Sequence, residues 1–480
     1  MRTDRNNGAA FRGGRKVWRG LVGSVVLAVL SACVPPEPQA GRRLDPDAPI
    51  ALPPARAFGA AAVMVPTRSN AEMARDFLDL SFRMESGREV AKLTRFGGPV
   101  EVRLTGPVPP FAEADLNRLI TRLRAEAGID IGPAGTGRGA EITVQFLPRR
   151  TIQALVPAAA CFVAPNVSSW DEYRRARGSA RTDWTALTVR ERVAVFIPAD
   201  VAPQEVRDCL NEEIAQGLGP LNDLYRLPDS VFNDDNVQGL LTGFDMLMLR
   251  VHYSPRLWNG MSEAEAAAVV PAVLAAVNPR GGPAGLAAAS DDTPRAYVSA
   301  IETALGPRAS PEARRGAAGR AIGIAEERGW RDARAGFAWF VLGRLSLSGR
   351  PDQALEAFGR AEAIYRGRPG MALQAANVGM QFAAFALSQG DAEAAIARAD
   401  AAAGPAAAAQ NAALLATLLL IKAEALDIGG REGEAASVRA EGLGWARYGF
   451  GSGAEVARRA TEIAALSPAR RAASVRRLMQ

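Results

Sequence analysis

The side chains best able to do chemistry in this sequence lie between Glu212 and Asn222. If residues 203 to 219 form a helix, one side of that helix carries an apolar stripe. The stripe consists of Val206, Cys209, Leu210, Glu213, Ile214 and Gly217. Glu213 thus falls among apolar side chains, where a carboxylate is unfavourable unless it is paired or its pKa is shifted. Such an acid is either a catalytic base or a structural hydrogen-bond acceptor, and the pattern leaves both open.

Histidine is almost absent, which limits the catalytic chemistry available. The chain has one His among 480 residues, His252, so a His-rich metal site has too few members, and the sequence indicates no Ser-His-Asp set around this one residue. We interpret His252, which lies between Val251 and Tyr253, as a packing residue. A phosphate site is also not indicated, because the Gly-rich residues 132–137 lack the Lys and the following helix that such a site needs.

An acidic stretch follows the predicted helix and runs from Asn222 and Asp223 to residues 233–236, Asn-Asp-Asp-Asn. Carboxylates and amides of this kind are calcium ligands in EF-hand loops. The stretch lacks the regular alternation and the distal Glu of an EF-hand loop. We therefore interpret it as a solvated loop rather than a calcium site.

The spacing of residues 212 to 222 resembles the HExxHxxGxxH motif of metzincin metallopeptidases, in which three His bind zinc and the Glu activates water. Glu212, Gln216 and Asn222 stand at the ligand positions of that motif, and Glu213 and Gly219 match its general base and its turn. One carboxylate and two neutral amides are a poor zinc set. The resemblance therefore implies a degenerate site with no bound metal, no cofactor and a vestigial base at Glu213.

Two downstream segments extend the resemblance. Residues 230–233 (Ser-Val-Phe-Asn) are similar to the turn that carries a Met below the metal in metzincins, with Phe232 in place of the Met. Residues 241–245 and 249–253 are similar to the closing helix of those enzymes. The resemblance spans roughly residues 60–278 and is closest to an uncharacterised bacterial family of secreted, metzincin-like domains of unknown function.

The surrounding pattern alternates predicted helices and strands. Helices are expected at 70–84, 110–127, 203–219 and 262–277, and strands at 99–104, 140–147 and 190–197. This order predicts a mixed α and β domain. A Gly- and Pro-rich break near residues 278–285 is consistent with a domain boundary.

The remainder of the chain shows only helical patterns and an internal repeat. Similar turns occur at residues 349–354, 390–395 and 430–435, spaced 41 and 40 residues apart, and each follows an apolar residue, namely Leu345, Ala386 or Leu426. Repeated helix-turn-helix units predict an α-solenoid, which resembles a tetratricopeptide-type (TPR-like) array. An irregular helical bundle is the alternative.

The N-terminus has the features of a secretory signal. Basic residues between Arg12 and Arg19 precede an apolar run at 21–30, and Leu-Ser-Ala leads directly into Cys33. This arrangement resembles the lipobox of bacterial lipoproteins, which implies a lipidated Cys33. Val34 stands where the inner-membrane retention signal has Asp, so sorting to the outer membrane is favoured. A Pro-rich tether is expected at 33–57.

Charge and cysteine content exclude further classes. The net charge is +6, but residues 1–32 hold six basic side chains and one acid, so the mature chain carries about +1. This balance gives no electrostatic case for nucleic-acid binding.

Cys161 and Cys209 form an even pair, which in an oxidising compartment is expected to be a disulfide rather than two free thiols.

Together these features predict an α+β chain: a metzincin-like mixed domain followed by an all-α helical-repeat domain. The expected parts are a lipoprotein signal peptide (1–32), the tether (33–57), a degenerate metzincin-like domain (58–280) and a helical-repeat domain (290–480). We expect a catalytically silent protein of the cell envelope that faces the periplasm.

Its partners would be the membrane, through the N-terminal lipid, and a protein or peptide, through the repeats or the old substrate cleft. One alternative is a metal-dependent peptidase or hydrolase with an atypical carboxylate-rich site. Another is an envelope scaffold in which both domains serve assembly.

Overall fold

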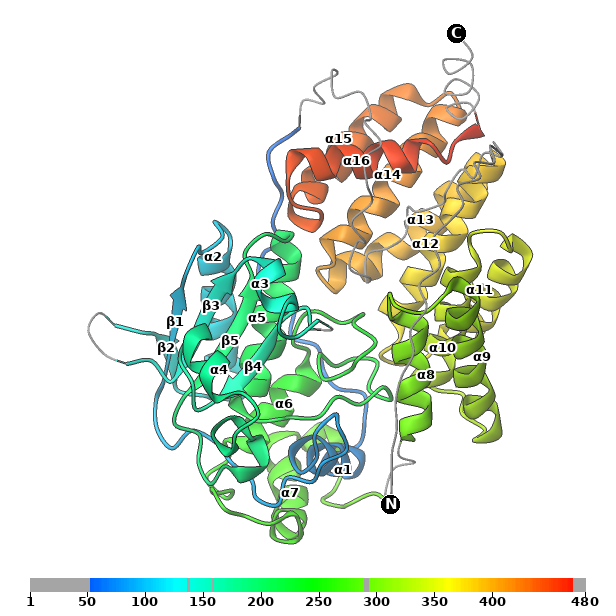
Figure 1. Cartoon of the computed structure of the whole chain (residues 1–480). Coiled ribbons are helices and arrows are strands. Elements are labelled where there is room, and N and C mark those ends of the chain that lie inside the picture. The colour runs from blue at the N-terminus through cyan, green and yellow to red at the C-terminus, as the bar shows by residue number, and fades with distance from the viewer. Residues whose placement is uncertain (1–51, 136–138, 158, 289–292, 469–480) are drawn as a thin grey trace, which may run out of the picture.

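The computed structural model describes residues 52–135, 139–157, 159–288 and 293–468. They form an α/β part in the N-terminal half and a helical part that arches over one side of it (Figure 1). The predicted signal peptide, Cys33 and residues 33–51 of the predicted tether lie outside the described residues. Among the helices that are described, none combines the length and the apolar character that a membrane span requires.

The α/β part is built on a five-stranded sheet with the order β2-β1-β3-β5-β4. Its strands are β1 (Val100–Thr105), β2 (Ile131–Pro133), β3 (Ile142–Leu147), β4 (Phe162–Pro165) and β5 (Val193–Pro198). All pairings are parallel except β4 with β5, so β4 is an antiparallel edge strand. The three predicted strands are confirmed as β1, β3 and β5. All residues of β5 are buried, as expected of a strand covered on both faces.

Helices cover this sheet and close the α/β part. They are α1 (Asn70–Ser81), α2 (Ala112–Arg122), α3 (Arg149–Gln153), α4 (Trp170–Ala176), α5 (Pro203–Leu218), α6 (Gly243–His252) and α7 (Glu263–Val277). The four predicted helices are confirmed as α1, α2, α5 and α7. Local capping explains two of their starts, because Ser69 with Glu72 and Ser262 with Glu265 each form a capping box.

The core of the α/β part lies between the sheet and the buried stripe of α5. Val206, Leu210 and Ile214 are at most 1% exposed, and α5 packs against β4, β5 and α2. Cys161, just before β4, forms a disulfide with Cys209 of α5, with Cα atoms 6.1 Å apart. The helix that carries the candidate site is therefore held against the sheet by burial and by a covalent link.

The helical part consists of consecutive helices joined by short turns. They are α8 (Arg295–Leu305), α9 (Pro311–Glu327), α10 (Ala333–Ser346), α11 (Pro351–Tyr365), α12 (Ala372–Gln389), α13 (Ala392–Ala408), α14 (Ala412–Ile428), α15 (Glu432–Gly449) and α16 (Gly453–Ala464). The turns that the repeat predicted separate α10 from α11, α12 from α13 and α14 from α15. Gly390 and Gly430 adopt φ values of 80° and 72°, which glycine tolerates best. This arrangement is consistent with a helical-repeat region.

The two parts share buried polar contacts. The Tyr448 hydroxyl of α15 donates to the carboxylate of Asp115 in α2 at 2.9 Å. The Gln374 amide of α12 donates to the Pro228 carbonyl at 2.6 Å. Residues 52–58 also lie along α15, where Phe58 stacks on the Trp445 ring at 4.3 Å. The helical part is therefore docked on the α/β part by specific groups.

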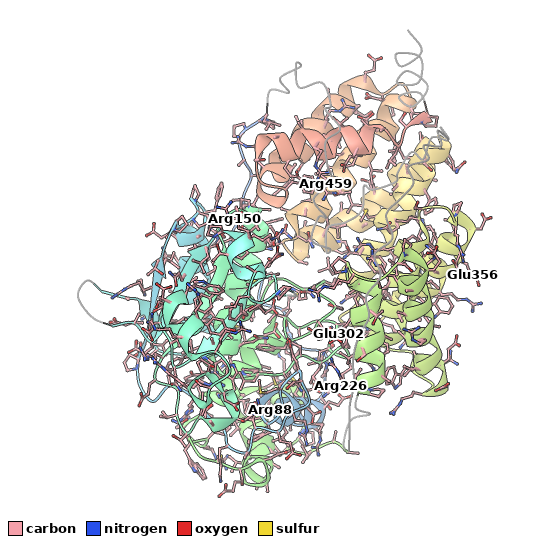
Figure 2. All side chains as sticks on the ribbon, in the orientation of Figure 1. Arg88, Arg150, Arg226, Glu302, Glu356 and Arg459 are labelled. Atoms are coloured by element: carbon pink, nitrogen blue, oxygen red, sulfur yellow. A yellow bond between two sulfur atoms is a disulfide. The ribbon has the colours of Figure 1, made fainter. Side chains whose placement is uncertain are left out.

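Charged side chains of both signs cover the two parts. Figure 2 labels Arg88 and Arg150 on the α/β part and Glu356 and Arg459 on the helical part. Many of these charges are paired locally, as Arg88 is with Asp183 at 2.7 Å. Interspersed and paired charges agree with the near-neutral balance expected for the chain after residue 32.

Candidate functional site

The C-terminal end of α5 is held by a buried arginine. Arg190 donates to the carbonyls of Gln216, Gly217 and Gly219 at 2.7, 2.8 and 2.6 Å. These carbonyls belong to the end of the helix, where backbone acceptors lack intrahelical partners. Burial lowers the pKa of Arg190 to about 10, so the side chain stays charged at neutral pH and complements the negative end of the helix dipole.

His252 packs directly beneath the end of α5. A Cβ added to Gly219 would lie 2.9 Å from Cγ of His252, so the ring occupies space that only glycine leaves free. The His252 Nε2 atom is 3.0 Å from the Thr94 carbonyl, and because a carbonyl only accepts, Nε2 carries the proton. Burial, with the charge of Arg190, lowers the pKa of His252 to about 3. The only histidine is therefore neutral and structural, as its sequence neighbours indicated.

Glu213 is buried and incompletely satisfied. Its side chain is 4% exposed, and its Oε2 atom has no hydrogen-bond partner. Burial raises the pKa of Glu213 well above its ordinary value, and the charges of Glu212 and Glu85 raise it further. Buried polar atoms without a partner are uncommon in folded proteins, so a structural acceptor role does not account for both oxygens of Glu213.

The three positions that correspond to zinc ligands do not converge as a set. The Gln216 side-chain amide donates to the Asp223 carboxylate, with Nε2 3.2 Å from Oδ2. The Asn222 amide turns away and donates to the Asp79 carbonyl of α1 at 2.9 Å. Glu212 is half-buried, and burial together with the charges of Asp234, Glu85 and Asp208 raises its pKa to about 8.

This arrangement does not fit zinc. Gln216 and Asn222 offer only neutral amide oxygens, which are weak ligands for zinc, and the chain supplies no His at any of the three positions. Catalytic zinc takes three protein ligands chosen mainly from His, Cys and carboxylates. The set at these positions offers one carboxylate.

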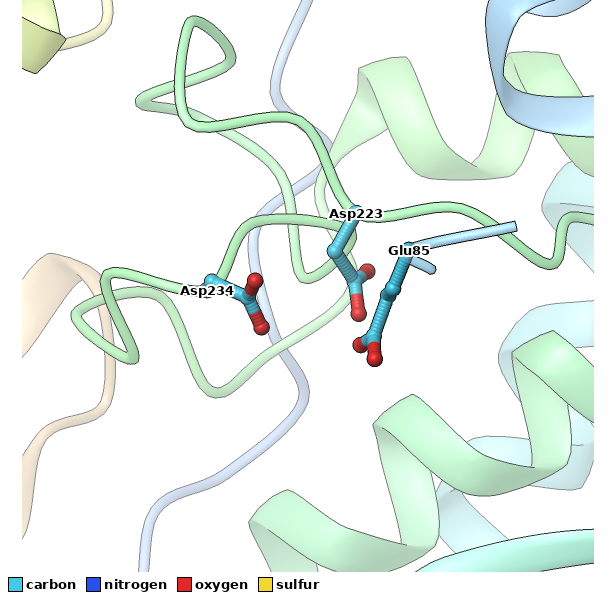
Figure 3. Close-up of side chains that lie close together, drawn as sticks. All are labelled: Glu85, Asp223 and Asp234. Carbon is cyan, nitrogen blue, oxygen red and sulfur yellow. The ribbon is translucent and has the colours of Figure 1, made fainter. Parts of the chain in front are cut away.

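Three carboxylates do meet beside α5. Oxygens of Glu85, Asp223 and Asp234 lie within 4.8 Å of one another, and Figure 3 shows the three side chains converging from separate segments. Glu85 is on the exposed turn after α1, Asp223 is buried, and Asp234 is half-buried. Burial, followed by the adjacent carboxyl of Glu85, raises the pKa of Asp223 well above its usual range.

Asp245 of α6 accepts hydrogen bonds that fix the loop carrying Asp223 and Asp234. The Ser230 hydroxyl and the Thr242 amide donate to Asp245 at 2.6 and 2.7 Å, and Phe232 is fully buried. Burial raises the pKa of Asp245 to about 7. The turn at residues 230–233 is thus fixed to the start of α6, and it positions Asp234 next to the end of α5.

The region that holds this site corresponds to a known domain family. Residues 70–272 match the model of a family described as "Protein of unknown function (DUF2927)". The DUF2927 match runs from α1 into α7 and includes the whole sheet, α5 and all three clustered acids. No curated protein and no solved structure matches the chain. The expectation of a domain of unknown function is thereby confirmed for the α/β part.

Sequence reasoning singled out α5 but missed part of the cluster within the DUF2927 region. Asp223 and Asp234 belong to the acidic stretch that we interpreted as solvated, and Asp223 is in fact buried. Glu85 carried no local pattern, because its role depends on a contact with a loop far away in sequence. The sequence did show several acids close together after a helix that was expected to be buried. The burial of Asp223 in the structure is what makes this group of acids significant.

Proposed function

We propose that the protein is a lipid-anchored component of the cell envelope, with a catalytically silent metzincin-like domain and a TPR-like helical domain that binds a protein or peptide. The observation that carries the silent half is that the amides of Gln216 and Asn222 turn to different partners, Asp223 and the Asp79 carbonyl, so that the three ligand positions do not converge. One carboxylate and two neutral amides that point apart are a poor ligand set for zinc at the positions where metzincins hold it.

The order of elements supports the metzincin-like part of the proposal. Strand β5 leads into the long helix α5, whose end is followed by a loop, the turn at 230–233 and the closing helix α6. The antiparallel strand β4 lies at the sheet edge beside β5. That edge is where an extended peptide could add to the sheet.

The helical part supports the interaction half. Its hairpins recur at the interval of the sequence repeat, and stacked helical hairpins commonly present extended binding surfaces. Two large apolar side chains are exposed on it, Leu355 at 38% and Ile428 at 37%. Both side chains are accessible to a partner and serve below as positions for crosslinking.

A cleavage screen tests the silent half. The full chain is incubated with a broad peptide library, and the same preparation is analysed for metal. We expect no cleavage above that of the Glu213→Gln variant. Cleavage that requires a stoichiometric metal and disappears in Glu213→Gln would contradict the proposal.

Membrane attachment is tested through Cys33. We expect acyl labelling of the wild-type chain, and release of the Cys33→Ala variant from membranes. A Cys33→Ala protein that stays in the membrane fraction, together with an unlabelled wild type, would contradict lipid anchoring.

The binding half is tested by site-specific photo-crosslinking in the envelope. The photoreactive residue replaces Leu355 or Ile428, and the exposed Lys92 of the α/β part is the control position. We expect a specific adduct from the helical positions and none from position 92, followed by binding of the identified partner to the purified full chain. No adduct at the helical positions would contradict this half.

A metal-dependent hydrolase is the second candidate, favoured by one observation. Glu213 is a buried acid with a raised pKa beside other carboxylates, and such acids are common at catalytic sites. Hydrolysis of peptides or esters by the full chain with Mn²⁺, Zn²⁺ or Ca²⁺ added would support this candidate. Unchanged background rates with all three ions would exclude it for those substrates.

A further inference from the structure

We propose that one face of α15 is a binding site for a segment of a partner protein that carries proline, a basic residue and an aromatic residue. The chain's own residues 52–59, which we call the strap, occupy that face in cis. Figure 1 shows the strap, coloured blue, beside α15. The inference rests on the proposed role of the helical part in binding a protein or peptide, and it adds a place and a ligand chemistry.

The helical part holds the backbone of the strap by hydrogen bonds. The backbone amide of Arg56 donates to the Gly444 carbonyl at 3.0 Å. The guanidinium of Arg447 donates to the Pro53 carbonyl at 3.1 Å. Hydrogen bonds to the main chain give affinity without selecting the side chains of the ligand.

The side chains of the strap show which ligand chemistry this face accepts. The Phe58 ring stacks on Trp445 with centroids 4.3 Å apart. The Arg56 guanidinium donates to the Glu441 carboxylate at 3.2 Å and lies 5.8 Å from the centroid of the Trp445 ring. Aromatic grooves of this kind recognise proline-containing segments, and two prolines precede Arg56 in the strap. We therefore expect a ligand with prolines, then a basic residue, then an aromatic one.

Gly444 makes room for the strap on α15. Apart from the backbone of its own helix, the three atoms nearest to a Cβ built on Gly444 all belong to the strap. They are Cγ and Cδ of Arg56, at 3.1 and 3.4 Å, and the carbonyl oxygen of Pro54, at 3.4 Å. Glycine is unfavourable inside a helix, so its use here fits a surface that another segment crosses closely.

The strap lies on the surface and does not fill the space beneath it. Within the described residues 52–69, none is buried. A cavity of about 490 Å³ remains between residues 53–56 and α15. The helix side of this cavity is formed by Ser437, Ala440, Glu441 and Gly444. Segments with few buried contacts detach at a lower free energy than the core does, so the strap can be exchanged for another segment.

A second cavity, of about 250 Å³, lies where the strap meets both parts of the molecule. Phe111 and Pro203 of the α/β part and Arg447 of the helical part line it. Ala55 of the strap lines both cavities. A larger apolar side chain at this position would bury more apolar surface than Ala55 does. A partner segment with such a residue should therefore bind more tightly than the strap.

The chain after the strap is tied to both parts. Gln410, in the turn between α13 and α14, donates to the Gly59 carbonyl at 3.2 Å. Arg68 pairs with Asp229 of the loop between α5 and α6. The strap can therefore leave α15 while the segment that follows it stays attached to the α/β part.

The experiment uses the purified full chain and a fluorescent peptide of residues 52–61, with binding measured by anisotropy. In wild type the tethered strap competes at a high effective concentration, so the peptide should bind weakly. Phe58→Ala removes the stacked ring from the strap, and this variant should bind the peptide at least about tenfold more tightly than wild type. A peptide carrying Ala55→Leu should bind the variant about tenfold more tightly than the native peptide. Equal affinity of the two peptides would show that the cavities do not belong to the site.

Changes on α15, added to Phe58→Ala, test the binding face itself. Trp445→Ala removes the ring on which the ligand stacks, and Gly444→Leu places a side chain where the strap lies. Each should weaken peptide binding at least about tenfold. Leu is favourable inside a helix, so Gly444→Leu keeps the test valid if Trp445→Ala fails to fold.

Matched controls separate the site from general loosening. Val63→Ala alters a side chain of the same N-terminal segment that is 69% exposed, and the peptide affinity should stay at the wild-type value. Trp339→Ala removes a half-buried tryptophan of α10. Added to Phe58→Ala, it should leave the gain in affinity intact.

Three results would overturn the site. They are the absence of peptide binding to Phe58→Ala at millimolar concentration, binding that persists in Gly444→Leu and Trp445→Ala, and an equal gain in Val63→Ala. These results would leave the proposed function standing, because crosslinking at Leu355 and Ile428 reports on partner binding elsewhere on the helical part. Peptide binding without any crosslinked partner would contradict those two positions and leave the α15 site intact.

Discussion

The side-chain amide of Gln216 donates to the carboxylate of Asp223, with Nε2 3.2 Å from Oδ2. This contact joins the end of α5 to the loop that follows it. It also shows that Asp223, and not its neighbour Asn222, faces the helix positions where a metzincin would hold zinc. A zinc site built into this helix should therefore use Asp223.

The Glu212→His/Gln216→His double variant tests that geometry. Two His four residues apart on a helix point to one ion, and Asp223 would supply the third ligand. We expect stoichiometric zinc in the purified double variant and none in wild type, as measured by metal analysis after dialysis. Adding Asp223→Ala should remove the zinc, whereas adding Asn222→Ala should not. A double variant that binds no zinc would show that the helix only imitates the motif.

Arg190 should contribute more to the free energy of unfolding than a surface arginine does, because it donates hydrogen bonds to three carbonyls at the end of α5. Arg190 reaches these carbonyls from two nitrogens, Nη1 and Nη2, whereas Lys carries its donors on one atom, so we expect it to leave at least one carbonyl unpaired at about 1–3 kcal/mol for each. We expect Arg190→Lys to lower the free energy of unfolding by about 2–4 kcal/mol in denaturant titrations.

Arg192→Lys is the control for this substitution. The Arg192 side chain is 40% exposed and pairs with Glu172, so its replacement should change stability by less than about 0.5 kcal/mol. Equal effects of the two substitutions would show that the carbonyl contacts of Arg190 are not important for stability.

Several features of the fold were predictable because they follow from the types and spacing of residues close together in the sequence. The stripe on α5 follows from spacing along one helix, and all of its members are buried. The start of α7 follows from the capping residues Ser262 and Glu265. The helical turns follow from recurring glycines such as Gly390. Each of these depends on a few neighbouring residues, which a single sequence displays.

Other features depend on contacts between distant segments and left no local pattern. Strand β4 has four residues and ends in Pro165, too short for alternation to be visible. Glu85 looks like an ordinary surface acid until the loop at 222–236 is brought beside it. The amide of Asn222 faces α1 because the Asp79 carbonyl lies there. Tertiary packing decides these positions, and spacing within one helix cannot.

His252 makes stability depend on pH in a defined direction. Its pKa is about 3 in the folded chain against about 6.5 when unfolded. Between these values the unfolded chain binds a proton and the folded chain does not, so stability falls as pH decreases. Above pH 6.5 the protonation of His252 does not affect the free energy of unfolding. Below pH 6.5 this free energy falls by up to about 1.4 kcal/mol per pH unit, until the pH reaches about 3. Nearby Arg190 and Arg95 both oppose protonation.

Because the chain has a single His, its imidazole gives one set of NMR signals that reports this titration directly. We expect no titration of the folded chain above pH 4. His252→Gln keeps a donor for the Thr94 carbonyl and removes the ionisable ring, so its stability should decline less than that of wild type between pH 6.5 and 4. A folded-state titration near pH 6.5 would contradict the buried, neutral ring.

The contact between Tyr448 and Asp115 should couple the two parts of the molecule. Asp115 is 2% exposed and accepts from the Tyr448 hydroxyl at 2.9 Å, so Tyr448→Phe leaves a buried carboxylate with one donor fewer. The expected cost is about 1–3 kcal/mol. Hydrogen exchange should quicken in both α2 and α15, which belong to different parts.

Tyr297→Phe removes a similar bond to the Arg334 carbonyl within the helical part and should quicken exchange in α8 and α10 alone. If Tyr448→Phe affected only α15, the bond would not couple the parts.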